Sequence, residues 1–204
     1  MTSAPLETDD ELLVRVQSGD EEGFLTLYRR RQAGLFRFAL HMSGSMPLAE
    51  DVTQEVFLAL LREGCGYDPE RGTLSGYLFG IARKLVLRHL ERARPVVALD
   101  LESDDFCQPE LAILDDPLVD LTRREGIDAL RRAVYALPRR YREVVVLCDL
   151  EEVDYADAAV ALGCPIGTVR SRLHRARGLL LEKLNQERDP RQALGTLKPA
   201  RCET

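Results

Sequence analysis

The segment from Glu151 to Leu181 constrains the fold most, because it contains two helical patterns separated by a tight turn. Asp154 can cap the first helix, and the acid Asp157 suits the positive end of its dipole. Gly163 is typical of a helix end, and Pro165 suits the first position of the next helix. Two short helices joined in this way form a helix-turn-helix.

Apolar residues repeat with helical spacing in both parts of this segment. The stripe expected to be buried on the first helix is Tyr155, Ala158, Ala159 and Leu162, and on the second it is Val169, Leu173, Ala176 and Leu180. The opposite face of the second helix carries Ser171, His174, Arg175 and Gly178, with Arg170, Arg172 and Arg177 at its edges. Such a face suits the major groove of DNA, where central side chains read bases and arginines hold phosphates. A solvated basic helix is the alternative.

Charge is unevenly distributed along the chain, whose net charge is -6. Residues 1–24 carry seven acids and one base, and residues 95–121 carry eight acids and no base. In contrast, residues 168–183 carry five bases and one acid. The negative total therefore conceals basic surfaces that can face a phosphate backbone.

Nearly every patterned segment has the helical period, so we predict an all-α fold. A chain of 204 residues with 45% hydrophobic content can form one ordinary domain or two small ones. We predict two small helical domains joined by an acidic linker. The expected boundaries are 1–95 for the first domain, 96–121 for the linker, 122–186 for the second domain with its helix-turn-helix, and 187–204 for a C-terminal tail.

The helix expected over residues 47–63 has apolar residues on two sides. The stripe expected to face the core is Leu48, Val52, Val56 and Ala59. The residues that fall largely opposite are Phe57, Leu58 and Leu61, interleaved with Asp51 and Gln54. A second apolar face indicates contact with another protein, and a fully internal helix is the alternative.

The helix expected over residues 73–95 combines aromatic and basic side chains. Its packing stripe is Leu74, Tyr77, Leu78, Ile81 and Leu85. Beside Tyr77 and Phe79 lie the basic residues Arg83, Lys84, Arg88, His89, Arg92 and Arg94. Stacking aromatics with nearby cations suit single-stranded bases, and the alternative is that the aromatics belong to the core.

Several classes of protein are not expected. The five cysteines, Cys65, Cys107, Cys148, Cys164 and Cys202, are far apart, so we predict reduced thiols and neither a disulfide framework nor a metal site. The acidic N-terminus and the lack of a long apolar run predict a cytoplasmic protein without membrane insertion. The three histidines are scattered, and no phosphate-binding loop or nucleophile motif is present. We therefore predict no catalytic residues and no cofactor.

Taken in order, these motifs resemble the extracytoplasmic function (ECF) sigma factors of bacterial RNA polymerase, the two-domain group of the sigma-70 family. The resemblance covers about residues 10 to 185. DVTQEVFL at 51–58 is similar to the D-x-x-Q-E-x-F pattern of region 2. Arg71–Gly72 and YLFGIAR at 77–83 resemble the part that opens and reads the minus-10 element. GTVRSRLHRAR at 167–177 resembles the minus-35 recognition helix of region 4.

The resemblance implies three sets of contact residues. Those for core polymerase, through the clamp helices of its largest subunit, are Asp51, Gln54, Glu55, Phe57, Leu58 and Leu61. Those for minus-10 DNA are Arg71, Thr73, Tyr77, Phe79, Arg83, Lys84 and Arg88, with residues 70–73 receiving a flipped base. Those for minus-35 DNA are Thr168, Arg170, Ser171, Arg172, His174, Arg175 and Arg177. The chain departs from the family pattern at Tyr77, Lys84 and Arg88, and at Asp157-Ala158, where Glu-Ile is frequent.

The expected function is that of an alternative sigma factor, which binds core polymerase and directs initiation at promoter DNA without being an enzyme. A free-standing helix-turn-helix regulator is the alternative. It predicts tight DNA binding without polymerase, whereas a sigma factor alone binds DNA weakly. Family members are commonly held inactive by an anti-sigma protein, and others are controlled by tails or by expression. The sequence does not choose among these, and it does not name the target promoters or the inducing signal.

Overall fold

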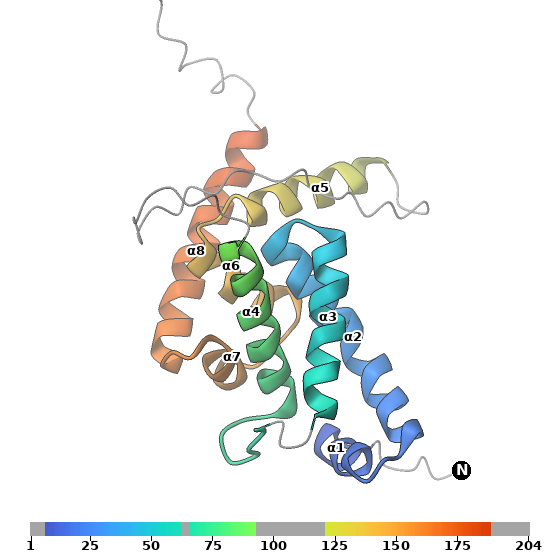
Figure 1. Ribbon diagram of the computed structural model, residues 1–204. Coiled ribbons are helices and arrows are strands. Elements are labelled where there is room, and N and C mark those ends of the chain that lie inside the picture. Colours follow the sequence, from blue (N-terminus) through green and yellow to red (C-terminus); the bar gives the residue numbers. More distant parts are fainter. Residues whose placement is uncertain (1–6, 63–65, 93–120, 189–204) are drawn as a thin grey trace, which may run out of the picture.

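The computed structural model describes residues 7–62, 66–92 and 121–188 (Figure 1). Its elements are α1 (Asp9–Gln17), α2 (Glu21–Ser43), α3 (Met46–Leu61), α4 (Leu74–Arg92), α5 (Leu121–Tyr135), α6 (Arg139–Val145), the π-helical turn η1 (Val146–Leu150), α7 (Tyr155–Leu162) and α8 (Ile166–Arg188). Within these residues no strand occurs, which confirms the all-α prediction. The acidic linker and the C-terminal tail lie almost entirely outside the described residues.

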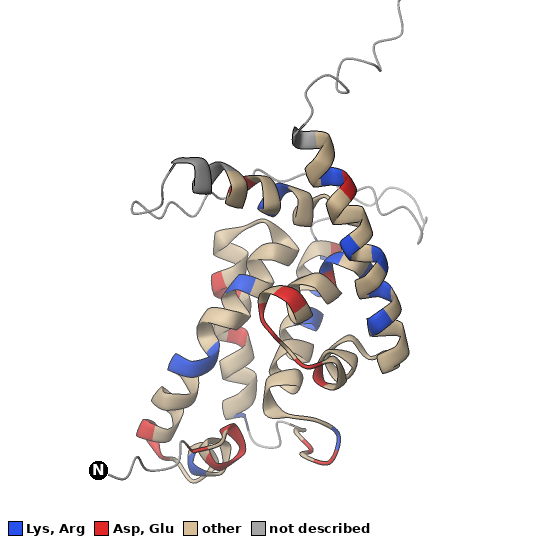
Figure 2. Ribbon diagram, turned by 180° about the vertical axis from the view of Figure 1, so that it is seen from behind, with Lys and Arg blue, Asp and Glu red and all other residues tan. Residues whose placement is uncertain are grey.

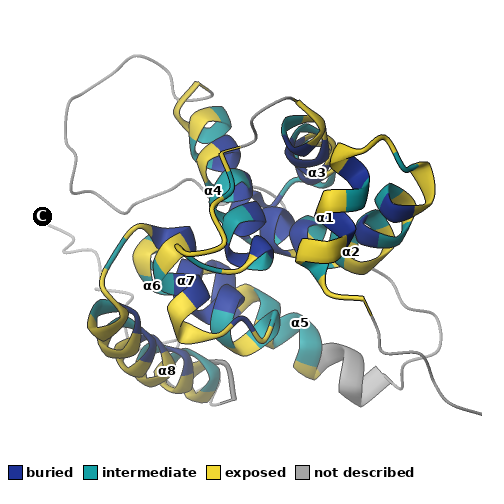
Figure 3. Cartoon of the chain, turned by 90° about the horizontal axis from the view of Figure 1, so that it is seen from below, coloured by how far each residue is buried: buried dark blue, intermediate teal, exposed yellow. Residues whose placement is uncertain are grey.

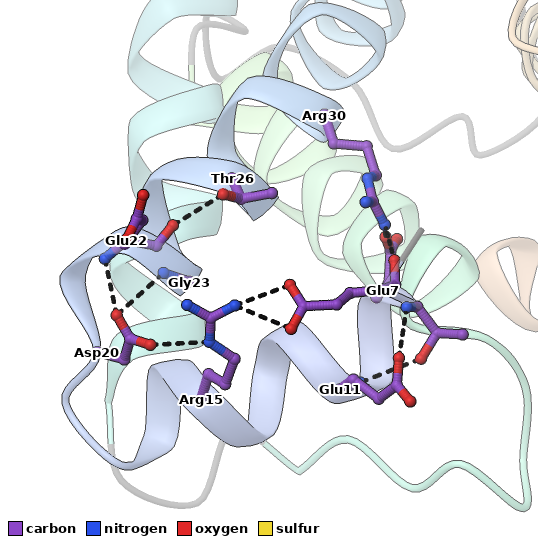
Figure 4. A network of polar contacts seen from close by, with 10 residues as sticks. Glu7, Glu11, Arg15, Asp20, Glu22, Gly23, Thr26 and Arg30 are labelled. Carbon is purple, nitrogen blue, oxygen red and sulfur yellow. Dashed lines mark hydrogen bonds and ion pairs between the residues drawn. The ribbon is translucent and has the colours of Figure 1, made fainter. Parts of the chain in front are cut away.

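The corner between α1 and α2 is built by caps and ion pairs (Figure 4). Thr8 and Glu11 form a capping box at the start of α1. Asp20 caps α2 by accepting hydrogen bonds from the backbone amides of Glu22 and Gly23. Arg15 donates from Nε to Asp20, at 2.8 Å, and from Nη1 to Glu7. These contacts end α1 and begin α2 within a few residues.

The first unit consists of α1 to α4, with α2, α3 and α4 packed side by side and α1 near their lower end in Figure 1. Its core contains the fully buried side chains of Leu27, Phe38 and Val52. Gly44, with φ of 70°, ends α2 in the left-handed region that favours glycine, and Ser45 then caps α3. This turn sets α2 and α3 against each other.

The second unit consists of α5 to α8. Pro138 separates α5 from α6, because it lacks the amide hydrogen that a helix interior requires. The predicted stripe of α8 is confirmed, since Val169, Leu173, Ala176 and Leu180 are all buried. The widened turn η1 after α6 was not predicted.

The two units pack against each other. Contacts join α4 to α7 and α2 to α5, α6 and η1, and the buried apolar side chains of both units form one continuous cluster. Figures 1 and 3 both show α4 between α3 and α7. The buried Arg142 of α6 donates to the carbonyl of Met42 at the end of α2, at 3.4 Å, and lies over the ring of Tyr135. Two helical domains were predicted, but this packing was not.

No helix in the described ranges has the length and apolar content needed to cross a membrane.

Candidate functional site

Helix α8 presents a polar and basic face to solvent (Figure 3). We call this the α8 face and define it by Thr168, Arg170, Ser171, Arg172, His174, Arg175 and Arg177. Arg172 and Thr168 are half-buried and the other five are exposed. Figure 2 shows the basic residues repeating along this helix. The exposed side predicted from the helical wheel is therefore present.

Three arginines of the α8 face have partners within the second unit. Arg177 makes a two-pronged contact with Asp149, through Nη2 at 2.6 Å and Nε at 3.1 Å. Arg170 lies 6.0 Å from the centre of the Tyr155 ring. A hydrogen bond from Arg175 lowers the pKa of the Tyr141 hydroxyl. With these partners in place the α8 face is still positively charged, and the contacts orient the guanidinium groups of the three arginines.

The turn before α8 differs by one residue from the prediction. The carbonyl of Pro165 accepts hydrogen bonds from the amides of Thr168, at 2.8 Å, and Val169, at 3.2 Å. Pro165 is therefore the cap that precedes the helix, and α8 begins at Ile166.

Helix α7 corrects two predictions. Tyr155 is 38% exposed rather than part of the buried stripe, and Asp154 occupies the N-cap position without making a side-chain cap hydrogen bond. The residues buried on α7 are Asp157, Ala158, Ala161 and Leu162. The reason is that α7 lies between two neighbours, α8 and α4, whereas the prediction considered one packing face.

Five of the predicted minus-10 residues line a hollow of about 440 Å³ at the start of α4. We call it the α4 pocket, and its predicted members are Arg71, Thr73, Tyr77, Arg83 and Lys84. Tyr67 adds a second ring, 5.6 Å from that of Tyr77. Its hydroxyl donates to Asp10 at 2.6 Å, and burial together with this bond raises the pKa of Tyr67 well above its usual range. Sequence reasoning missed Tyr67, which lies three residues before the segment expected to receive a base.

The other two predicted minus-10 residues lie elsewhere. Phe79 is only 5% exposed and packs edge-on against Phe38, with 5.6 Å between ring centres, so it belongs to the core of the first unit. The expectation that Phe79 stacks on bases is wrong for this conformation, and its stated core alternative is correct. Arg88 lies toward the other end of α4 and pairs with Glu55 of α3 at 3.1 Å.

Two residues of the α4 pocket bind acids of the second unit. Asp157 accepts hydrogen bonds from the Thr73 amide, at 3.2 Å, and from the Thr73 hydroxyl, at 2.5 Å. Arg83 donates from Nε to the buried Glu143 of α6 at 3.0 Å. In addition, α7 contributes Val160 and Ala161 to the lining of the pocket. Asp157 and Glu143 occur among apolar residues, but no sequence pattern indicated that they would pair with Thr73 and Arg83.

The exposed side of α3 contains five of the six predicted polymerase contacts. We call it the α3 face, formed by Asp51, Gln54, Glu55, Leu58 and Leu61. Leu58 and Leu61 are 54% and 50% exposed, and because they lie three positions apart they share one side of the helix. Phe57 does not share this face: it is 3% exposed, and its ring lies 4.7 Å from that of Tyr28. Its predicted outward position is therefore wrong, because α2 supplies aromatic partners inside the unit.

The described residues contain no cluster of three or more His, Cys, Asp or Glu with the arrangement of a metal site. Cys148 and Cys164 are free thiols, and burial raises the pKa of Cys148 to about 11. Cys65, Cys107 and Cys202 lie outside the described residues.

Comparisons with known proteins cover both units. The model of sigma-70 region 2 matches residues 27–96, and the model of sigma-70, region 4 matches residues 127–180. The ECF RNA polymerase sigma factor SigE of Mycolicibacterium smegmatis is 34% identical over 158 residues, which are 78% of this chain and 60% of that protein. SigM of Mycobacterium tuberculosis is 33% identical, with coverage of 87% and 85%, and the sigma-E factor of Escherichia coli is 31% identical, with coverage of 87% and 94%.

Two solved structures are similar. The sigma factor RpoE of Bartonella quintana, in complex with the anti-sigma factor NepR, has a TM-score of 0.64 and 27% identity, covering 80% of this chain and 98% of that one. CnrH, in complex with the cytosolic domain of CnrY, has a TM-score of 0.65 at 23% identity, covering 89% and 99%, and shows a likeness of fold. With both units matched and relatives above 30% identity across most of their length, the chain belongs to the ECF sigma factors of the sigma-70 family.

Proposed function

We propose that this sigma factor acts through three surfaces: the α3 face holds core RNA polymerase, the α4 pocket takes minus-10 DNA, and the α8 face takes minus-35 DNA. Residues 1–95 and 122–186 would then be the two functional domains. Its mechanism is binding and positioning, with the chemistry of RNA synthesis left to the polymerase. The proposed place of action is the cytoplasm.

The composition of the α3 face supports a protein partner. Leu58 and Leu61 offer apolar area on one side of the helix, and Asp51 and Gln54 surround it with polar groups. An apolar centre with a polar rim is the usual anatomy of a protein interface. The proposed partner is the pair of clamp helices in the largest polymerase subunit.

The α4 pocket has the chemistry needed for an unstacked base. The rings of Tyr67 and Tyr77 can stack on its faces, and the exposed cations of Arg71 and Lys84 can follow its phosphates. A hollow of this kind suits a base that has left the duplex, because unstacking costs a few kcal/mol that stacking on aromatic rings offsets.

The α8 face has the chemistry needed for a major groove. Ser171, His174 and Arg175 occupy its centre, where short donors and a forked guanidinium can reach base edges. Arg170 and Arg177 flank them at positions suited to phosphate contacts. The buried stripe of α8 holds the helix rigidly on the second unit, so these side chains are presented in a fixed order.

The proposed partners are core RNA polymerase and promoter DNA. We propose an anti-sigma protein as a third partner, because the similar sigma factor RpoE is bound to the anti-sigma factor NepR in its solved structure. The observation that carries the proposal is that three chemically distinct faces lie on three helices matched by the region 2 and region 4 models.

The test is to mix the full chain with core polymerase and select promoters from a random DNA pool by transcription. We expect a holoenzyme that initiates at a shared sequence. Leu58→Lys should weaken polymerase binding by at least about tenfold, whereas Val14→Lys, at an exposed apolar residue of α1, should not. Tight binding of a duplex by a dimer without polymerase would instead establish a free-standing regulator.

A further inference from the structure

The loop that borders the α4 pocket lies beside the first turn of α1. It covers residues 66–73, and we call it the α4 loop. Figure 1 shows it at the lower end of the first unit, the same end as α1. Its residue Tyr67 lines the α4 pocket, and the Tyr67 ring lies 5.6 Å from that of Tyr77. The position of the α4 loop therefore determines where one of the two rings stands in the pocket.

The first turn of α1 holds the α4 loop near its beginning. Asp10, an exposed acid of this turn, accepts a hydrogen bond from the Tyr67 hydroxyl at 2.6 Å. A hydrogen bond to an ionised carboxylate is stronger than one between neutral groups. Burial and this bond raise the pKa of Tyr67 well above its usual range, so the hydroxyl keeps its proton and remains a donor.

The same turn also reaches the other end of the loop, where the chain enters α4. Asp9 accepts from Arg30 and Arg31 of α2. Arg31 in addition donates from Nη1 to the hydroxyl of Ser75, in the first turn of α4, at 3.2 Å. Two neighbouring acids of α1 are therefore connected to both ends of the α4 loop, Asp10 directly and Asp9 through Arg31.

This turn of α1 is itself fixed in place. In its capping box the Thr8 amide donates to the Glu11 carboxylate at 2.7 Å, and the Glu11 amide donates to the Thr8 hydroxyl at 3.3 Å (Figure 4). Leu12 and Leu13, which follow, are buried in the core. All these contacts join residues of the first unit, so they do not depend on the position of the second.

We propose that Asp10 is a positioning residue for base recognition: through Tyr67 it holds the α4 loop in the shape that accepts the minus-10 base. This inference rests on the assignment of the α4 pocket to DNA in the proposed function. A base of the wrong shape can then enter only by displacing the held loop, which costs free energy, whereas a free loop adapts to several bases. Promoter specificity would thus depend on α1, which lies outside residues 27–96, the part that the region 2 model matches.

Three substitutions separate the hydrogen bond from the ring and from the charge. Tyr67→Phe keeps the ring and removes the hydroxyl. Asp10→Ala removes the acceptor, whereas Asp10→Asn keeps a carbonyl oxygen that can accept and removes the charge. The matched controls are Tyr28→Phe, at a ring that packs against Phe57, and Glu21→Ala, at an exposed acid in the first turn of α2.

The measurement is made on the holoenzyme with the single-stranded minus-10 strand of a promoter that it selects. Each base of the element is changed in turn, and the readout is the ratio of affinities for the original and the changed strand. At the base that enters the pocket, Tyr67→Phe and Asp10→Ala should lower this ratio roughly threefold to tenfold, the usual range for one hydrogen bond. Asp10→Asn should keep most of the ratio, and both controls should keep all of it.

A double variant tests whether Asp10 acts through Tyr67. Tyr67→Phe combined with Asp10→Ala should lose no more discrimination than either change alone, because both remove the same bond. A merely structural role would instead lower the unfolding temperature and the affinity for every strand alike, with the ratio unchanged. An unchanged ratio, additive losses in the double variant, or an equal loss in Asp10→Asn and Asp10→Ala would each overturn the proposal.

The two proposals fail in different ways. If Lys84→Ala and Tyr77→Ala weaken minus-10 binding by the holoenzyme while Tyr67→Phe and Asp10→Ala leave the ratio unchanged, the positioning role is wrong and the proposed function stands. If Lys84→Ala and Tyr77→Ala also leave minus-10 binding unchanged, the α4 pocket is not the DNA site and both proposals are wrong.

Discussion

The α8 face and the α4 pocket are both assigned to DNA, yet the structure presents them differently. The α8 face points to solvent along its whole length, whereas the α4 pocket is lined on one side by α7, and its residues Thr73 and Arg83 are bonded to Asp157 and Glu143. The face is made by one helix against its own unit, so its exposure follows from the helical wheel. The pocket depends on where the second unit sits. Surface chemistry alone therefore does not say whether a DNA site is available.

The largest effect on stability is expected for Phe79, an aromatic residue that is buried in the core instead of lining the α4 pocket. Phe79→Ala should lower the free energy of unfolding by about 3 to 5 kcal/mol, because it leaves a cavity beside Phe38. Denaturant titration measures this change. Tyr77→Ala, at a half-buried ring of the α4 pocket, should cost less stability and reduce minus-10 binding instead. Equal effects of both substitutions would show that the two aromatics have the same role.

Acid should lower the stability of the folded chain through His41. Burial, with Arg131, Arg37 and Arg142 nearby, lowers the pKa of His41 from 6.5 to about 4. The folded chain therefore holds a neutral imidazole, and its stability contribution is complete above pH 6.5. As pH falls from 6.5 toward 4, the unfolded chain binds a proton that the folded chain excludes, and about 3 kcal/mol is lost. His41→Gln should flatten this part of the stability profile, and an unchanged slope would refute the assignment.

Arg175 tests whether the α8 face reads sequence. Arg175→Ala should cost roughly 1 to 3 kcal/mol of discrimination between the selected minus-35 sequence and a mutated one. Competition binding by the holoenzyme measures it. A loss of equal size on both sequences would show that Arg175 holds phosphate only.

The smallest effect is expected at the edge of that face. Asp149→Ala releases Arg177, and because this pair is exposed, stability should change by less than about 1 kcal/mol. Affinity for duplex DNA should rise slightly at low salt, since one acid beside the phosphates is removed. A fall in affinity would indicate that Asp149 positions Arg177 for its contact.

Prediction from sequence succeeded where a helix is covered on one side and faces solvent on the other. The buried stripe of α8 followed from local spacing, and the start of α8 differed by one residue from the prediction for Pro165. Prediction failed where a helix packs on more than one side. Phe57 and Phe79 lie inside the first unit, and Tyr155 lies outside the stripe assigned to it. The helical wheel shows which residues share a side, but not which sides are covered.

The sequence by itself determined the helices, the family and the chemistry of the three faces, because periodicity, caps and motif residues act within a few turns of chain. Only the tertiary structure decided that Asp157, one of the departures from the family pattern, bonds to Thr73, and that Glu143 meets Arg83. These partners are 84 and 60 positions apart. No local pattern specifies such a pairing, because it depends on how two apolar surfaces fit together in space.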